Sequence, residues 1–436
     1  MQISSVEVAN SRNRDATDFE GDSFAKLTPH SISDRFFRSH WQSFFLIAMV
    51  SWLLIGNAYR GANTGRVHED FQTFYNAGYR LNHGQPLYDW KTWSNADDLH
   101  FARFSYDYTP TVGIIARPFA VFSMDTAYKL WFVSQVLFLF GAIALFAIFS
   151  DYALSGTVPI TICLITGMHY WPTVCNFDVG QVNFLMLFLL CGLLVCQKRS
   201  QFTAFGVIVG LLACVKYWAI GLTCLLLLQR KWRASFAAIC TFAGVTTLQF
   251  AFIGWSEVGN FSIVATKVVT QVTKALPSQS VFGFFRMLFS ETAFSKPMLP
   301  LNDIAYWFAC AIACASIAGI SYFVIRNTPV STKAVPLKYA LTIQSILLLL
   351  PACHIVYFIF SLRVLWILLF IPARHSSRGA YITLGAASLY LVAMHWPFPD
   401  TGVWLLGFFY WSLALWLLSM CALLLADKPE PVQVTA

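Results

Sequence analysis

The sequence is poor in charged residues. Only 11% of its 436 residues are Asp, Glu, Lys or Arg, and 57% are hydrophobic, whereas a soluble domain carries about 25% charged residues. This shortage excludes an ordinary soluble fold. Because the apolar runs are continuous and about 20 residues long, they also exclude the alternating pattern of a membrane β-barrel. The sequence therefore predicts an all-α, polytopic transmembrane helical bundle.

Other patterns are also absent. No Cys-x-x-Cys occurs among the 11 cysteines, and we interpret these residues as small packing side chains of membrane helices. No repeat of fixed period is present, which weakens the case for a duplicated transporter. The net charge is +8, but the basic residues are divided among short loops, so we expect no nucleic acid partner.

Apolar runs recur along the chain and predict about twelve spans. Basic clusters between the runs predict that both termini are cytoplasmic. Residues 1–40 and 427–436 are then flexible cytoplasmic tails, and residues 41–426 form a single membrane domain. The expected spans are 41–58, 124–150, 158–175, 180–197, 202–215, 217–228, 234–254, 304–325, 341–350, a run that ends before Arg374, 381–395 and 403–426.

Two large loops are expected on the outer side, at 59–123 and 255–300, and the first is rich in aromatic residues. In the first loop, apolar residues recur at near-helical spacing from Asp70 to Leu81, and Gly84 stops the pattern. Prolines punctuate the rest of this loop. Short helices lying in the membrane interface fit this pattern better than a folded outer domain.

Polar residues at helix ends that face one compartment are the functional signal in a membrane protein. Lys216 breaks two short apolar runs that lie between basic clusters, so it is expected at the outer tip of a helical hairpin. That places a cation on the same side as Asp70. Other outer residues are Glu69, Arg103, Tyr106, Asp107, Tyr108, Asn176, Asp178, Gln181, Asn183, Lys267, Lys274, Gln279, Ser280, Arg286 and His354.

Each candidate also has a purely structural interpretation. Glu69 and Asp70 fit a helix N-terminus, and Lys216 fits a snorkelling side chain. Gln181 and Asn183 fit a helix cap with interhelical hydrogen bonds. In structural terms, Arg286 fits a side chain that anchors a helix at the membrane interface, and His354 fits a helix cap.

The outer set suggests two kinds of chemistry. A carboxylate can accept the proton of a hydroxyl nucleophile, and several cations can neutralise a phosphate leaving group. Aromatic side chains can stack on the apolar faces of sugar rings. The candidates for such stacking are Tyr88, Trp90 and Trp93.

The order of these motifs resembles the GT-C superfamily of membrane glycosyltransferases. It is most similar to the polyprenyl-phosphate-mannose-dependent mannosyltransferases of glycosyltransferase family 87. The matching residues of the first loop are Asp70, then Tyr75 and Ala77, then Gly84, Pro86 and Tyr88, then Tyr106, Tyr108 and Pro110. Those of the later segments are Gly180, Gln181 and Asn183, then Lys216 with the basic cluster 230–233, then Gln279, Ser280 and Arg286.

The chain departs from the family pattern at three places. Ser278 stands where the family has Asn, Tyr217 and Trp218 stand where it has prolines, and the family's histidine motif is reduced to the stretch from Pro351 to His354.

The resemblance implies transfer of a sugar, mannose by analogy, from a polyprenyl-phosphate donor to a hydroxyl of a lipid-linked or cell-envelope glycan. Asp70 would be the general base of an inverting reaction, and Lys216, Arg286 and His354 would bind the donor phosphate. The expected sugar and acceptor contacts are Glu69, Tyr75, Tyr88, Tyr108, Gln181, Asn183 and Gln279. Gln181 and Asn183 have a second possible role, which is to hold the loop.

The same resemblance implies a bacterial inner-membrane protein with its site on the periplasmic side and with membrane lipids, donor and acceptor as partners. No cofactor is expected. The absence of an Asp-x-Asp motif argues against a metal-bound sugar nucleotide as donor, and so against a required metal. The rival functions are a lipid or solute transporter or flippase, a lipid-dependent transferase that moves an acyl or phospho-containing group, and a purely structural membrane protein.

Overall fold

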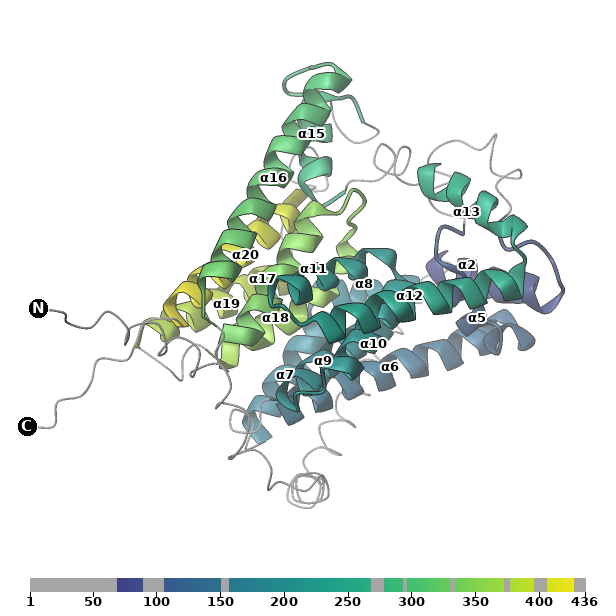
Figure 1. Ribbon diagram of the computed structural model, residues 1–436, viewed down its shortest axis with the longest axis horizontal. Helices are drawn as coiled ribbons and strands as arrows, with labels where there is room; N and C mark the ends of the chain where they lie inside the picture. Colours follow the sequence, from purple (N-terminus) through teal and green to yellow (C-terminus); the bar gives the residue numbers. More distant parts are fainter. Residues whose placement is uncertain are drawn as a thin grey trace, which may run out of the picture. The chain divides into compact units, whose positions relative to one another are not determined.

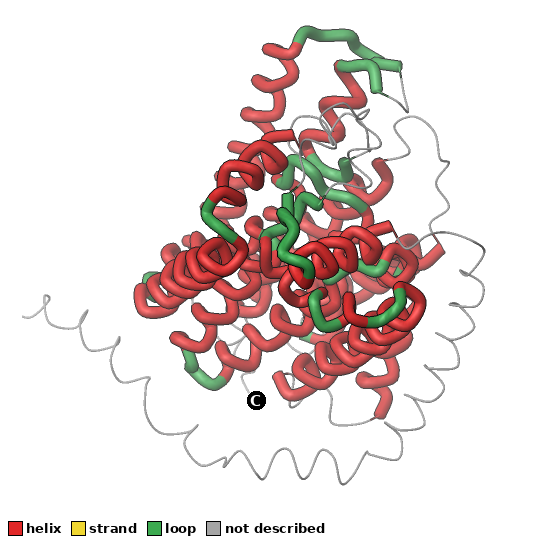
Figure 2. Tube along the Cα trace, turned by 90° about the vertical axis from the view of Figure 1, so that its right-hand side faces the viewer, coloured by secondary structure: helices red, strands yellow, loops and turns green. Residues whose placement is uncertain are grey.

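The computed structural model describes residues 69–88, 106–149, 157–267, 278–292, 296–329, 334–371, 377–395 and 406–426. Within these ranges every element is a helix and no strand occurs, as the sequence predicts (Figure 2). All of them belong to one unit of the chain, Leu54–Ala436. The first expected span and both expected tails lie outside the described residues.

The helices of the first half are α2 (Glu69–Asn82), α5 (Pro110–Ala116), η1 (Phe119–Val121), α6 (Met124–Phe149), α7 (Thr157–His169), α8 (Trp171–Val179), α9 (Asn183–Lys198), α10 (Phe202–Val215), η2 (Tyr217–Gly221) and α11 (Leu222–Leu228). Those of the second half are α12 (Trp232–Ile253), α13 (Ser256–Lys267), α15 (Val281–Phe289), α16 (Asp303–Asn327), α17 (Ala334–Leu349), η4 (Ile355–Phe358), α18 (Ile359–Phe370), α19 (Ser377–His395) and α20 (Gly407–Ala426).

Four of the described helices, α6, α12, α16 and α20, are long and apolar enough to cross a membrane. Several others, such as α9, α10 and α17, are apolar but shorter. Large apolar side chains remain exposed on the long helices, among them Phe236 at 71% and Phe308 at 68%, as expected for surfaces that face lipid. The expected total of about twelve spans stays a prediction.

Close helix packing relies on small residues. A Cβ atom built on Gly206 of α10 would lie 2.1 Å from the carbonyl oxygen of Ala234, and one on Gly210 would lie 2.7 Å from that of Ala238. Both alanines are on α12 and fully buried. The two helices therefore approach as closely as small-residue membrane interfaces allow, and they run side by side in Figure 1.

Two differences from the predicted spans affect how the helices are interpreted. The predicted span 158–175 is two helices, α7 and α8, because Tyr170 adopts an extended conformation and Pro172, in the first turn of α8, has no N–H with which to continue α7. Lys338 precedes the predicted span 341–350 and was therefore expected in the loop between two spans, yet it lies inside α17, where its ammonium donates to the carbonyl oxygen of Thr328 at 2.5 Å. The sequence placed it in a loop because a lone lysine in an apolar run reads as a helix boundary.

The predicted first outer loop contains α2, α5 and η1, which pack together. Gly78 of α2 allows this contact, since a Cβ there would lie 2.7 Å from the carbonyl carbon of Ala116. Asn82 and Arg117 exchange hydrogen bonds of 3.0 and 2.9 Å. The helical interpretation of residues 70–81 is confirmed by α2, whereas the location of these helices in a membrane interface stays a prediction.

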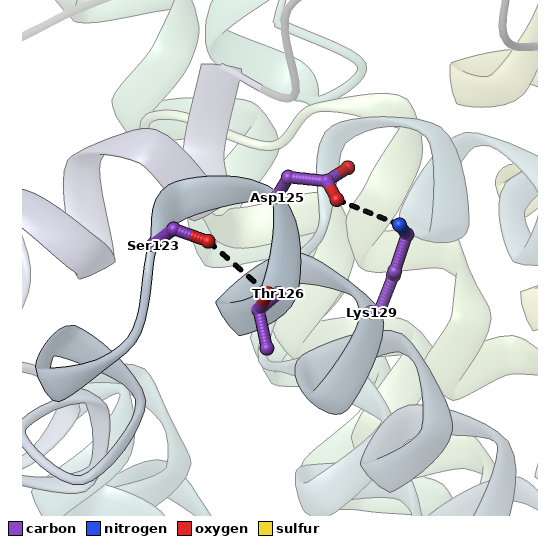
Figure 3. Close-up of polar contacts among 4 residues, drawn as sticks. All are labelled: Ser123, Asp125, Thr126 and Lys129. Carbon is purple, nitrogen blue, oxygen red and sulfur yellow. Dashed lines mark hydrogen bonds and ion pairs between the residues drawn. The ribbon is translucent and has the colours of Figure 1, made fainter.

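The first turn of α6 is stabilised by local polar contacts (Figure 3). The hydroxyl of Ser123 donates to that of Thr126 at 3.1 Å, and Lys129 pairs with Asp125 at 2.6 Å. Both charged side chains are largely exposed, so the pair contributes at most about 1 kcal/mol. Asp125 also interacts favourably with the N-terminal end of the helix dipole. These contacts mark where the long apolar helix begins.

Candidate active site

Gln181 lies at the centre of the polar residues that the structure brings together. Its amide nitrogen donates to Asp70 Oδ2 at 2.7 Å and to the hydroxyl of Tyr108 at 2.7 Å. Its amide oxygen accepts from Lys216 Nζ at 3.3 Å. Because an ammonium group can only donate, the lysine fixes which end of the amide faces the acid. We call Asp70, Tyr108, Gln181 and Lys216 the central group.

The turn between α8 and α9 positions Gln181. Gly180 has a left-handed backbone (φ +74°), and a Cβ at this residue would lie 2.6 Å from Cβ of Phe71. The indole of Trp131 donates to the carbonyl oxygen of Gly180 at 2.8 Å. Only glycine satisfies both the conformation and the close approach. Since Phe71 follows Asp70 directly, this contact brings the amide to the carboxylate.

The end of α10 positions Lys216. Here the helix gives way to an extended residue, and the last carbonyl groups need partners. The hydroxyl groups of Thr109 and Thr111 both donate to the carbonyl oxygen of Cys214, and Thr109 also bonds to Val215 at 3.2 Å. The segment that carries Tyr108 is thereby attached to the residues just before Lys216, whose side chain is only 4% exposed.

Two aromatic rings face the ammonium group of Lys216. Its nitrogen lies 4.0 Å from the ring centroid of Tyr357 and 5.1 Å from that of Tyr108. Cation–π contacts of this kind stabilise a desolvated ammonium. Sequence analysis did not identify Tyr357. It follows His354 by three residues. Because 17% of the chain is aromatic, a single tyrosine in the sequence does not indicate a contact with a distant lysine.

The central group has ionisation properties suited to proton transfer. Burial raises the pKa of Asp70 to about 6, although the hydrogen bond from Gln181 and the charge of Lys216 act in the opposite direction. Burial lowers the pKa of Lys216 to about 8, while the charges of Asp70 and Asp107 act to raise it. At neutral pH the acid is therefore mostly ionised and the lysine mostly protonated, as a general base beside an anion-binding cation requires.

Asp107 is a second carboxylate near the central group, noted among the outer residues but not chosen as a site residue. Burial and the charge of Asp70 raise the pKa of Asp107 to about 7, against the effect of Lys216. Among the described residues, no group of three or more His, Cys, Asp or Glu side chains is placed to share a metal ion. Independence from metal stays a prediction.

With this geometry in view, comparison with known proteins identifies the family. The profile of glycosyltransferase family 87 matches residues 106–351. This range is more than half of the chain and includes Tyr108, Gln181 and Lys216. The protein belongs to glycosyltransferase family 87. The family resemblance inferred from the motifs is thereby confirmed, and four of the described helices are long and apolar enough to cross a membrane.

A curated relative points in the same direction. An α-(1→3)-arabinofuranosyltransferase of Corynebacterium glutamicum is 25% identical over 255 residues, which cover 57% of each chain. The chain thus spans little more than half the length of this relative. Both comparisons support glycosyl transfer. They do not identify the sugar, the donor or the mechanism of this family 87 protein.

The loop that carries His354 is held by the segment before α15. The backbone nitrogen of Gln279 donates to the carbonyl oxygen of Cys353 at 2.6 Å, and the nitrogen of Cys353 donates to the hydroxyl of Ser278 at 2.9 Å. The amide oxygen of Gln279 accepts from the nitrogen of Phe409 at 3.3 Å. In this family 87 protein, Gln279 therefore contacts the protein, and its predicted role as a sugar ligand stays untested.

His354 precedes η4 and lies near Lys216. Burial and the charge of Lys216 lower the pKa of His354 to about 4, so the imidazole is neutral at neutral pH. A neutral ring can donate one hydrogen bond to a phosphate but supplies no positive charge. Its predicted phosphate contact is therefore restricted to a hydrogen bond.

Arg286 lies apart from the contacts of the central group. It is 7% exposed on α15, where its guanidinium stacks 4.0 Å from the ring centroid of Tyr306 and lies 3.6 Å from Asp303 Oδ1. Both partners are on α16. The sequence placed Arg286 and Lys216 on one side of the membrane, but a shared side does not ensure shared contacts. A phosphate contact of Arg286 stays a prediction.

The other predicted ligands make contacts within the protein. Asn183 donates to the side-chain oxygen of Asn176 at 2.8 Å and to the carbonyl oxygen of Val356 at 3.2 Å, which holds the loop of η4. Tyr75 donates to the carbonyl oxygen of Phe122 at 2.8 Å. Glu69 is half-buried beside Asp70 at the start of α2.

Tyr88 is 1% exposed. Its hydroxyl donates to the carbonyl oxygen of Tyr108 at 2.8 Å, its backbone nitrogen donates to Glu257 at 2.9 Å, and its ring packs against Tyr106 and Phe261. These contacts position Tyr108, and sugar stacking by Tyr88 stays untested. Trp90 and Trp93 lie outside the described residues.

Proposed function

We propose that this protein transfers a sugar from a polyprenyl-phosphate donor to a hydroxyl group of a lipid-linked or cell-envelope glycan, with inversion at the anomeric carbon. The observation that carries the proposal is the single amide that joins Asp70 to Lys216. It sets a group able to accept a proton beside a group able to receive a phosphate. The inner membrane of a bacterium, with the central group on its periplasmic side and both termini cytoplasmic, is the proposed location.

In the proposed reaction, Asp70 accepts the proton of the acceptor hydroxyl. The hydroxyl oxygen then forms a bond to the anomeric carbon from the face opposite the phosphate. The bond between that carbon and the phosphate oxygen breaks, and its electron pair leaves on the phosphate. A phosphate needs no proton to leave, so one carboxylate suffices, unlike the pair that glycosidases use.

Lys216 neutralises the leaving phosphate in this scheme. Its ammonium has three donor hydrogens, and the contact to Gln181 is long for a hydrogen bond. Exchanging that contact for a phosphate oxygen would convert a weak interaction into a charge-assisted one. His354 is the second proposed donor to the phosphate. Gln181 keeps the base and the cation at a fixed separation.

Two sugars are candidates. Motif resemblance to mannosyltransferases favours mannose, whereas the curated relative is named as an arabinofuranosyltransferase and favours a pentose. Both fit the same displacement at an anomeric carbon. Purified protein in liposomes, supplied with polyprenyl-phosphate-mannose or polyprenyl-phosphate-arabinofuranose and an envelope glycolipid extract, separates them by the hexose or pentose increment in the product mass.

A membrane transporter is the competing function. Incubation of the same liposomes with labelled donor should give covalent product that depends on Asp70. Movement of the intact donor across the bilayer, without any mass increment in the acceptor, contradicts the proposed transfer.

A further inference from the structure

A second set of charged residues lies at the other end of α9. Gln181 precedes α9 and Gln197 lies in its last turn. Since the helix has 16 residues and rises about 1.5 Å per residue, roughly 20 Å separate the two ends. At the far end, Lys231 donates to the amide oxygen of Gln197 at 2.8 Å. The hydroxyl of Tyr339 reaches the same oxygen at 3.4 Å.

Positive charges accumulate here. Lys231 lies in the turn between α11 and α12, flanked by the exposed side chains of Arg230 and Arg233. Lys338 on α17 lies close enough that burial and its positive charge together lower the pKa of Lys231 to about 8. Like charges that act on each other in this way favour the binding of an anion. We call Arg230, Lys231, Arg233 and Lys338 the basic end.

The helices that form the basic end contain no acid that could offset this charge. No Asp or Glu occurs between Asp178 and Glu257, or between Asp303 and Asp400. These two stretches include the whole of α9, α10, α11, α12 and α17. The amide nitrogen and oxygen of Gln229, in the same turn, are both buried without a hydrogen-bond partner among the described residues. Within these helices the turn therefore has an unpartnered amide and no carboxylate of its own.

The side chains around the turn are those of a membrane surface. Trp232 is 65% exposed and Phe236 is 71% exposed, one helical turn further along α12. Tryptophan beside lysine and arginine is typical of the boundary between acyl chains and headgroups. The N-terminus of α12 also presents backbone N–H groups to an anion. A ligand with a phosphate and acyl chains matches both features.

We propose that the basic end binds the phosphate of an anionic membrane phospholipid, with Lys231 as the principal ligand. Arg230 and Arg233 contact the headgroup, Lys338 adds positive potential from α17, and the acyl chains lie along Trp232 and Phe236. The site is separate from the central group and does not depend on the proposed sugar transfer.

The test measures thermal stabilisation of the full chain in detergent by phosphatidylglycerol, phosphatidylcholine or inorganic phosphate. Wild-type protein should be stabilised by phosphatidylglycerol more than by phosphatidylcholine. Lys231→Gln should weaken the apparent affinity for phosphatidylglycerol roughly fivefold, as expected for one lysine at an anionic surface. Lys231→Arg should preserve it. Lys129→Gln is the matched control, because Lys129 is an exposed lysine already paired with Asp125.

Three results overturn the proposal. Equal stabilisation by the two phospholipids removes the requirement for an anionic headgroup. Equal losses in Lys231→Gln and Lys129→Gln show a general charge effect. Stabilisation by inorganic phosphate alone, as strong as that by phosphatidylglycerol, shows a phosphate site without lipid. Should Lys231→Gln fail to fold, Arg230→Gln replaces it, because Arg230 is exposed and its loss leaves the contact with Gln197 intact.

Discussion

Lys216 and Lys231 have similar immediate partners but opposite electrostatic surroundings. Each donates to a glutamine oxygen, at 3.3 and 2.8 Å, and each lies over an aromatic ring, at 4.0 Å from Tyr357 and 4.2 Å from Phe202. Each has a pKa of about 8. The acids Asp70 and Asp107 act on Lys216, whereas the cation Lys338 acts on Lys231.

The comparison shows that a lowered lysine pKa can have different electrostatic causes. Around Lys216, burial lowers the pKa and carboxylates raise it, so the lysine stands beside acids in a site suited to acid–base chemistry. Around Lys231, burial and repulsion act in the same direction. Such a place favours binding of an anion over acid–base chemistry.

The largest effect should come from the acid of the central group. Asp70→Asn removes the proton acceptor while preserving size, and sugar transfer should fall by about 10² to 10⁴-fold, the usual contribution of a general base. Initial rates with radiolabelled donor measure this. Asp125→Asn is the control, since Asp125 is an exposed acid paired with Lys129. Near-normal turnover of Asp70→Asn would exclude the base assignment.

The two lysines provide the next test. Lys216→Met should lower kcat/KM for the lipid-phosphate donor by about 10²-fold, as loss of one transition-state donor does. Lys231→Met should change it less than about twofold, because Lys231 lies at the other end of α9 and contacts neither Asp70 nor Gln181. Equal losses in both variants, or a change in acceptor KM alone, would contradict the phosphate role of Lys216.

Tyr357 allows a smaller test of the same group. Tyr357→Leu removes the ring that faces the ammonium, and donor kcat/KM should fall about 3 to 30-fold, in line with a desolvated cation–π contact. Tyr357→Phe keeps the ring and should retain most of the activity. If the phenylalanine variant is as impaired as the leucine variant, the hydroxyl is what matters and the ring contact is irrelevant.

The smallest expected effect is a shift of the pH profile. Transfer needs ionised Asp70 and protonated Lys216, so kcat/KM should rise with pH through about 6 and fall through about 8. Gln181 lowers the pKa of Asp70 by donating to its ionised form, so Gln181→Leu should move the acid limb to higher pH. Gln135→Leu, a buried glutamine of α6, should leave the limb in place. If the acid limb of the kcat/KM profile stays in place in Gln181→Leu, a group other than Asp70 controls that limb.

Much of the local structure could be predicted from the sequence. The helix expected from Asp70 to Leu81 is α2 with one residue added at each end, and the run 202–215 coincides with α10. Glycine at the turn before α9 was recognised as part of a motif. Periodicity, caps and glycine are properties of neighbouring residues, so they can be read without the fold.

The candidate site was predictable only in part. Asp70, Gln181 and Lys216 were chosen, and the structure brings them together. Tyr357 and the closeness of Asp107 to Lys216 were missed, and Arg286 proved to contact α16. Such contacts depend on how α9, α10 and the loop before α18 pack, which a pattern of residue types along the chain does not record.

The sequence by itself determined that this is a helical membrane protein with an acid, an amide and a lysine at helix ends, because hydrophobicity and turn chemistry are local. Only the tertiary structure decided that Gln181, just before α9, joins Asp70 to Lys216. It also decided that Gln197, in the last turn of α9, binds Lys231 near a second cation, Lys338. Both arrangements come from close helix approach at small residues, and such approach brings together side chains that lie far apart in the chain.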